Sequence, residues 1–102
     1  MIELGGNIKL ENFEDIDKGI LVVIKKMIGN YTKQISEKNK NFKEILVSRD
    51  GNNIKIVCMC DKEIKAEVEE KNLMFGLGKA LNEILDKCWL KIIFLFFTSF
   101  LI

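Results

Sequence analysis

The residue types that most often do chemistry in proteins are scarce in this chain. Its 102 residues include no histidine and three cysteines, Cys58, Cys60 and Cys88. Without histidine, a cysteine nucleophile lacks its usual base and a three-cysteine zinc site lacks its usual fourth ligand. Cys58 and Cys60 lie two apart in a predicted strand and would face the same side, so we interpret them as buried free thiols. No metal and no cofactor are predicted.

Enzyme motifs are missing from the sequence. It contains no P-loop, no GxGxxG and no GxSxG. The stretch GLGK at 76–79 resembles a phosphate-binding turn, but it lies inside an amphipathic helical pattern rather than after a strand. Carboxylates are plentiful, and the pattern forces none of them into an apolar pocket. We therefore predict a protein that is not an enzyme and that has no small-molecule substrate.

Charge is unevenly distributed along a chain whose net charge is +1. Residues 18–43 hold seven lysines and one acidic residue, Glu37, whereas residues 1–17 hold one lysine and five acidic residues. A local block of positive charge can bind nucleic-acid phosphates. The alternative is a solvated helix face, and charge alone favours that alternative.

The elements that must position these residues follow from the spacing of apolar side chains. Alternation predicts strands at about 2–10, 42–49, 54–60 and 64–70. The Gly5-Gly6 pair in the first strand indicates a bulge or a close backbone approach.

Apolar residues three or four apart predict two helices. The first covers 17–37, with Asp15 or Asp17 as the N-cap, and contains Gly29 as a site of close packing or a kink. The second begins near Asn72. The order β-α-β-β-β-α predicts an α+β two-layer sandwich, with a four-stranded sheet and both helices on one face. The first two strands are parallel if they are neighbours, and the later hairpins are antiparallel.

One domain is expected, at residues 1–88, followed by a hydrophobic tail at 89–102. Residues 92–102 carry no charge. As a helix they would rise about 16 Å, against a hydrocarbon core of about 30 Å, so a simple membrane span is not expected. We rank an extension foreign to the domain's family first, self-association second and membrane contact third. The lack of an N-terminal signal peptide predicts a cytoplasmic protein.

Three stretches of the predicted domain carry a family pattern. The first strand reads IELGGNIKL, the first helix VVIKKMIGNYTKQI, and the last strand and helix IKAEVEEKNLMFGLGKALNEIL. Together they resemble the ribosome hibernation-promoting factor family, also called ribosome-associated inhibitor or light-repressed proteins, over residues 1–88. The most specific part is a strand-to-helix junction. That junction is matched by Ala66, Glu67, Asn72, Leu73, Gly76 and Leu77.

The resemblance implies a fold similar to that of double-stranded RNA-binding domains. It also implies a protein that occupies the decoding channel of the small ribosomal subunit and inhibits translation in hibernation or stress. In the family, basic side chains on both helices hold the ribosomal RNA backbone. Carried over by position, the RNA-binding residues would be Lys25, Lys26, Lys33, Lys79 and Lys87. Lysine contacts to phosphates provide affinity without reading sequence, which agrees with this role.

The chain also departs from the family pattern. The family's second helix carries an Asp-Lys-Leu step, and this chain has Asn82-Glu83-Ile84, which replaces a cation with an anion. The basic stretch after that helix is absent, and the hydrophobic tail stands in its place. The alternative function is therefore a small α+β protein–protein interaction module that forms a homodimer through its tail or a sheet edge and has no RNA role.

Overall fold

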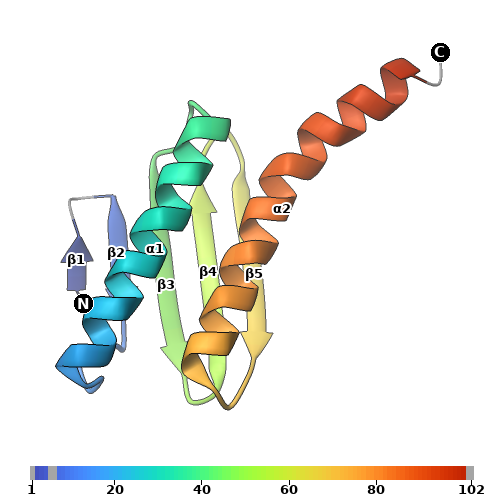
Figure 1. Ribbon diagram of the computed structural model, residues 1–102. Coiled ribbons are helices and arrows are strands. Elements are labelled where there is room, and N and C mark those ends of the chain that lie inside the picture. Colours follow the sequence, from blue (N-terminus) through green and yellow to red (C-terminus); the bar gives the residue numbers. More distant parts are fainter. Residues whose placement is uncertain (1, 5–6, 101–102) are drawn as a thin grey trace.

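The computed structural model describes residues 2–4 and 7–100, and it describes side chains up to residue 87. The elements are β1 (Ile2–Leu4), β2 (Ile8–Glu11), α1 (Lys18–Lys38), β3 (Glu44–Asp50), β4 (Asn53–Met59), β5 (Glu63–Glu69) and α2 (Leu73–Phe100). The strands form one sheet in the order β1-β2-β3-β4-β5, and both helices cover the same face of it (Figure 1). The expected two-layer α+β sandwich is therefore confirmed.

The sheet has five strands, so the prediction of four was wrong. The expected strand at 2–10 is instead two antiparallel strands, with Ile2 opposite Leu10 and Leu4 opposite Ile8. Residues opposite each other in such a pair share one face of the sheet. The hairpin thus keeps every apolar residue of the period-two pattern on one side, which is why the pattern did not separate it from a single strand. The bulge expected at Gly5-Gly6 lies outside the described residues.

The other pairings agree with the expected topology. β2 and β3 are parallel, with Ile8 opposite Ile45, and α1 provides the crossover that a parallel pair requires. β3 pairs antiparallel with β4, and β4 pairs antiparallel with β5. β5 is therefore the edge strand at the end of the sheet away from β1.

Side-chain caps fix where both helices begin. The carboxylate of Asp17 accepts hydrogen bonds from the backbone N–H of Gly19 at 3.1 Å and of Ile20 at 3.4 Å. Asn72 Oδ1 accepts the backbone N–H of Phe75 at 3.0 Å. Such caps satisfy N–H groups that have no partner within the helix. Both helix starts were predicted correctly because Asp and Asn precede the apolar periodicity.

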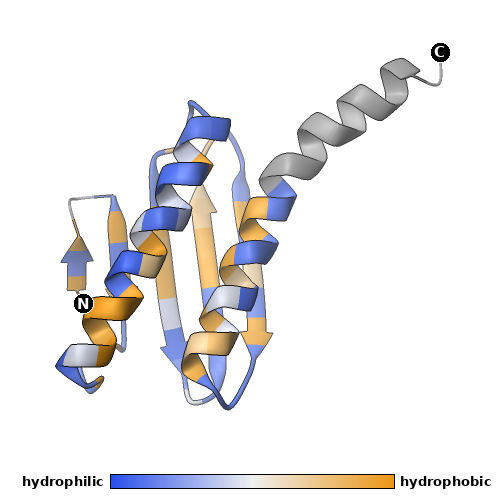
Figure 2. Ribbon diagram, viewed as in Figure 1, coloured by the Kyte–Doolittle hydropathy of each residue, from blue (hydrophilic) through white to orange (hydrophobic). Residues whose placement is uncertain are grey.

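The core lies between the sheet and the two helices. Figure 2 shows the hydrophobic segments of the central strands beneath α1 and α2. Fully buried aliphatic side chains come from both helices and from β3 and β4, namely Ile24, Ile28, Ile35, Leu77, Leu81, Ile84, Ile45, Val47 and Ile56. Cys58 and Cys60 are also buried, with their sulfurs 3.8 Å apart and no disulfide between them. Their interpretation as buried thiols outside a disulfide is confirmed, and the side chain of Cys88 lies outside the described ones.

Two glycines differ in what surrounds them. A Cβ on Gly76 would lie 2.9 Å from Ile54 Cδ1 and 2.9 Å from Glu70 Cβ, so this glycine lets α2 approach β4 closely. The GLGK stretch thus serves packing at its first position. A Cβ on Gly29 would meet no atom within 4 Å, which rules out the close packing considered for it.

The second helix continues through the backbone of the hydrophobic tail as far as Phe100. The side chains of that tail lie outside the described ones, so its three proposed roles stay predictions. Within the part of the chain that could be searched, no helix is both long enough and apolar enough to cross a membrane.

Candidate nucleic-acid interface

The lysines of α1 lie mainly on the side of the helix turned away from the core. Lys26 and Lys33 are seven residues apart, about two helical turns, so they share one side of α1. Both are exposed, whereas Ile24, Ile28 and the rest of the apolar stripe are buried. Lys25 is half-buried, one residue round the helix from Lys26. The helix therefore presents a short row of two amines with a third beside it.

These amines are available to an external anion. Across the described part of the chain, no ion pair or hydrogen bond joins the side-chain amine of Lys25, Lys26, Lys33 or Lys79 to another residue. Lys79 is exposed on the outer side of α2. A lysine that is not paired with a carboxylate of its own protein can pair with a phosphate instead. Four of the five predicted RNA-binding residues meet this condition.

The fifth predicted residue, Lys87, is engaged within the protein. Its amine lies 3.7 Å from a carboxylate oxygen of Glu83 and donates a hydrogen bond to the backbone carbonyl of Lys65. Lys65 belongs to the edge strand β5, so Lys87 lies on the flank of α2 that is turned from α1. The structure therefore does not bring Lys87 together with the lysines of α1. It also shows that the anion Glu83, which departs from the family pattern, is paired with Lys87.

A polar contact joins the two helices directly. The hydroxyl of Tyr31 on α1 donates a hydrogen bond to Asn82 Oδ1 on α2 at 2.8 Å. Asn82 is the first residue of the step that differs from the family pattern. The bond shows that Tyr31 and Asn82 lie on the sides of their helices that face each other.

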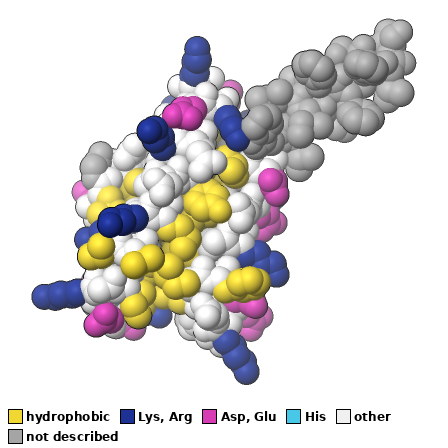
Figure 3. Space-filling view, in the orientation of Figure 1, with side chains coloured by type: hydrophobic (Ala, Val, Ile, Leu, Met, Phe, Trp, Pro, Cys, Tyr) yellow, Lys and Arg dark blue, Asp and Glu magenta, His cyan; other side chains and the backbone are white. Residues whose placement is uncertain are grey.

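Exposed apolar side chains on this face were not predicted from the sequence. Ile20 and Val23 of α1 and Phe75 of α2 are each about half exposed, from 46% for Ile20 to 61% for Phe75, whereas the exposed Val22 lies on the opposite side of α1 from Tyr31. Figure 3 shows hydrophobic side chains gathered along the space between the helices, with lysines and some acidic side chains around them. The face is thus an apolar strip with a charged border rather than a continuous basic ridge. The run GILVVI at 19–24 gave the signal, because it is more apolar than one buried helix side requires.

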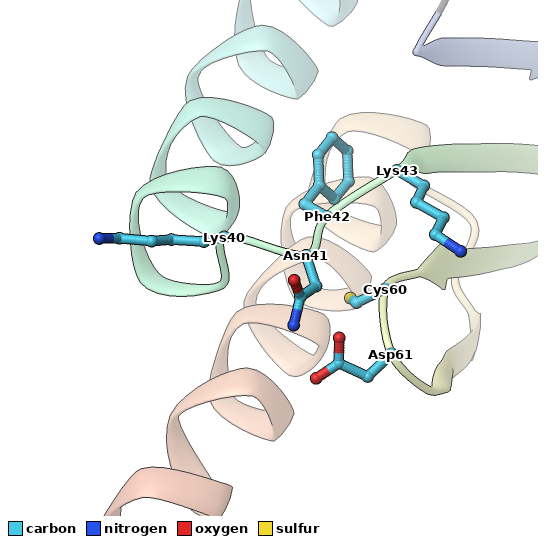
Figure 4. Close-up of a pocket in the computed structure, with 6 residues that line it drawn as sticks. All are labelled: Lys40, Asn41, Phe42, Lys43, Cys60 and Asp61. Carbon is cyan, nitrogen blue, oxygen red and sulfur yellow. The ribbon is translucent and has the colours of Figure 1, made fainter.

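An open pocket lies away from this face, between the loop after α1 and the turn after β4. Its volume is about 500 Å³. In Figure 4 the side chains of Asn41 and Asp61 extend into it, whereas those of Lys40 and Lys43 point away in opposite directions. The pocket does not gather its cations, so it is not an anion site of the kind predicted for the helices.

The comparisons with known proteins gave matches among solved structures alone. No family model matches the chain, and no curated protein matches it. The N-terminal domain of Protein Y from Thermus thermophilus superposes with a TM-score of 0.58 at 10% identity, covering 79% of this chain and 91% of that one. A ribosomal subunit interface protein from Coxiella burnetii superposes with a TM-score of 0.50 at 9% identity, covering 80% of this chain and 92% of that one. At this identity the two matches show a shared fold, and at the level of the fold the resemblance expected from the sequence is confirmed.

Proposed function

We propose that this protein is a non-enzymatic, ribosome-associated protein that binds ribosomal RNA through α1. One observation carries the proposal: Lys26 and Lys33 form an exposed row without internal carboxylate partners, among the described residues, on a fold shared with a ribosomal subunit interface protein. Lys25 and Lys79 extend the same cationic surface. Lys87 contributes less, because its amine is already paired with Glu83.

The chemistry of lysine sets what kind of recognition this surface can provide. An ammonium group is a compact charge that binds a phosphate without reading the base attached to it. Folded RNA is recognised largely by its shape and its backbone. Binding should therefore depend steeply on salt, because each phosphate contact releases condensed counterions.

The proposal also names a binding site on the ribosome and an effect on translation. We infer that the partner is the small ribosomal subunit, that the site is its decoding channel, and that the bound protein inhibits translation by excluding mRNA and tRNA. The family pattern in the sequence supports this placement. A stress or hibernation role in the cytoplasm follows from the same pattern.

Co-sedimentation of the full-length protein with purified small subunits tests the proposal. We expect binding at about 50 mM salt that is largely lost by about 200 mM salt, as for other proteins that bind through several phosphates. A variant with Lys25→Glu, Lys26→Glu and Lys33→Glu should sediment with the subunits far less than the wild type at the lower salt. Unchanged binding by this α1 triple variant would mean that the proposed face is wrong.

A matched control distinguishes binding through the proposed face of α1 from attraction by the overall charge of the protein. Lys43, Lys55 and Lys62 are exposed and lie outside both helices. Changing these three to Glu alters the net charge by the same amount as the α1 triple variant. The control should retain most of its binding. Equal losses in the two variants would point to nonspecific attraction.

The inhibitory step needs its own measurement. Added to a purified translation reaction at low salt, the wild-type protein should reduce peptide synthesis, and the α1 triple variant should not. If the protein binds the subunits but peptide synthesis is undiminished, ribosome association stands and the proposed inhibition is wrong. Absence of subunit binding, together with dimerisation of the wild-type protein, would favour the protein–protein interaction module instead.

A further inference from the structure

Phe75 is the most exposed large hydrophobic side chain on the described surface, at 61%. It lies on the first turn of α2, where its backbone N–H is held by Asn72 Oδ1 at 3.0 Å. The backbone beneath the ring is therefore fixed, although the ring itself is open to solvent. None of the core contacts requires an aromatic ring at this position, so core packing does not explain the exposed ring of Phe75.

Phe75 borders the space between the two helices. Asn82 follows it by seven residues, so both lie on the same side of α2, and the bond from Tyr31 shows that this side faces α1. Gly78 lies between them, and a Cβ placed on Gly78 would meet no atom within 4 Å. The space over Gly78, beside Phe75, is therefore open.

The opposite wall of this space is also apolar. Ile20, Val23 and Met27 precede Tyr31 by eleven, eight and four residues, which places them along the side of α1 that carries Tyr31. Ile20 and Val23 are about half exposed, and Met27 is partly buried against the core. Figure 3 shows hydrophobic side chains gathered along this space.

The two helix segments that carry this apolar strip hold charges of one sign. No acidic residue occurs in α1 from Lys18 to Tyr31 or in α2 from Leu73 to Asn82. Lys79 follows Phe75 by one helical turn, which places the two side chains next to each other on the helix surface. On α1, Lys26 follows Val23 by three residues, so it lies beside Val23 on the helix surface. The surface therefore fits a polyanion that also offers flat apolar faces.

We propose that Phe75 stacks on an unpaired RNA base while Lys79 holds a neighbouring phosphate. The inference rests on the proposed RNA-binding function and adds the class of RNA, a single-stranded or splayed-out segment. Aromatic side chains stack on bases that are out of the helix, and lysines beside them follow the backbone. Bases inside a duplex are stacked on each other and do not reach such a ring.

The test measures binding of full-length variants to a labelled, unstructured RNA of about 12 nucleotides and to a blunt-ended duplex of similar length, since single-strand sites span roughly 4–16 nucleotides. The variants are Phe75→Ala, Phe75→Leu and Phe75→Tyr. Val22→Ala is the control, because Val22 is 51% exposed but lies nine residues from Tyr31, on the opposite side of α1. Thermal unfolding of each variant confirms that it is folded.

We expect Phe75→Ala and Phe75→Leu to bind the single strand about tenfold more weakly, in line with the usual loss of one base stack. The tyrosine variant and Val22→Ala should bind like the wild type. Phe75→Ala should leave the salt dependence unchanged, whereas Lys79→Glu should reduce the slope of log K against log salt by about one or more. Duplex binding should not respond to Phe75.

Four results would overturn the inference. Full affinity in Phe75→Leu would mean that any apolar group suffices, as in a protein–protein contact. An equal loss on the single strand and the duplex would also exclude stacking on an unpaired base. If the wild type binds neither RNA nor small subunits, the proposed function fails and the inference fails with it. If the wild type binds and the Phe75 variants bind equally well, the inference alone is wrong.

Discussion

The hydroxyl of Tyr31 donates a hydrogen bond to Asn82 Oδ1 across 2.8 Å, and this contact sets α1 beside α2. Replacing Tyr31 with Phe removes the donor and keeps the ring. We expect the free energy of unfolding to fall by about 0.5–1.5 kcal/mol, the usual net value of one hydrogen bond. Urea denaturation measures the change. In a double-mutant cycle, Asn82→Ala should add little to Tyr31→Phe, and full additivity would show that the two groups do not interact.

Arg49, the only arginine of the chain, joins the end of β3 to the loop before α1. Its Nη2 lies 2.5 Å from Asp15 Oδ1, its Nε donates to the carbonyl of Asn12 at 3.1 Å, and its guanidinium lies 5.8 Å from the centre of the Phe13 ring. Lysine would keep the charge but lose the planar fork of donors. We therefore expect Arg49→Lys to lower the melting temperature, and an unchanged melting temperature would show that the fork has no structural role.

The same contact gives a pH dependence of defined sign. The hydrogen bond from Arg49 holds the pKa of Asp15 below its ordinary value of 3.8. A lowered pKa in the folded state means that the ionised carboxylate stabilises the protein above its unfolded pKa, and that this stabilisation is lost as the pH falls through the folded pKa. Unfolding measured from pH 5 down to pH 2.5 should therefore show a decline in the wild type that is smaller in Asp15→Asn. Asp61→Asn serves as the control carboxylate, and identical profiles for Asp15→Asn and the wild type would contradict the assignment.

Two glycine substitutions in the helices should have opposite effects on stability. Gly76→Ala places a methyl group 2.9 Å from both Ile54 Cδ1 and Glu70 Cβ and should destabilise the fold by about 1–3 kcal/mol. Gly29→Ala meets no atom within 4 Å and should stabilise it by about 0.5–1 kcal/mol, because alanine loses less backbone entropy in a helix. Denaturation midpoints test both. A stabilising Gly76→Ala would mean that α2 lies farther from β4 than described.

Thr32 is buried in α1, and within the described structure its hydroxyl has no hydrogen-bond partner. A buried hydroxyl without a partner lowers stability, so the near-isosteric change Thr32→Val should raise the free energy of unfolding by about 1 kcal/mol. Ser36→Ala is the comparison, because the Ser36 hydroxyl is exposed and donates to the carbonyl of Lys33 at 2.9 Å. Loss of stability in Thr32→Val would indicate that the hydroxyl has a partner, such as an ordered water.

The sequence predicted most of the fold because its local signals agreed with one another. Asp17 and Asn72 precede the apolar periodicity of the two helices and cap them. The fifth strand was missed because Ile2 and Leu4 keep the same spacing from Ile8 and Leu10 whether the chain runs straight or folds back. To distinguish a single strand from a hairpin, one must know which residues pair with each other. The spacing of apolar residues does not carry that information.

The candidate interface was predicted in part. The α1 lysines lie where periodicity places them, off the buried stripe. The engagement of the Lys87 amine was not predicted, because it depends on Lys65, which is distant in sequence and close in space. The exposed apolar strip was also missed, because the periodicity that identifies the buried side of a helix does not place an apolar residue such as Phe75 that lies outside it.

Salt-dependent binding of the full-length protein to purified small subunits tests the central claim most directly. The slope of log K against log salt reports how many phosphates the protein contacts, at about one per phosphate. We predict a steep decline for the wild type and a slope smaller by about two to three for the variant with Lys25, Lys26 and Lys33 changed to Glu. Equal slopes for the two proteins, or binding that does not respond to salt, would contradict the account.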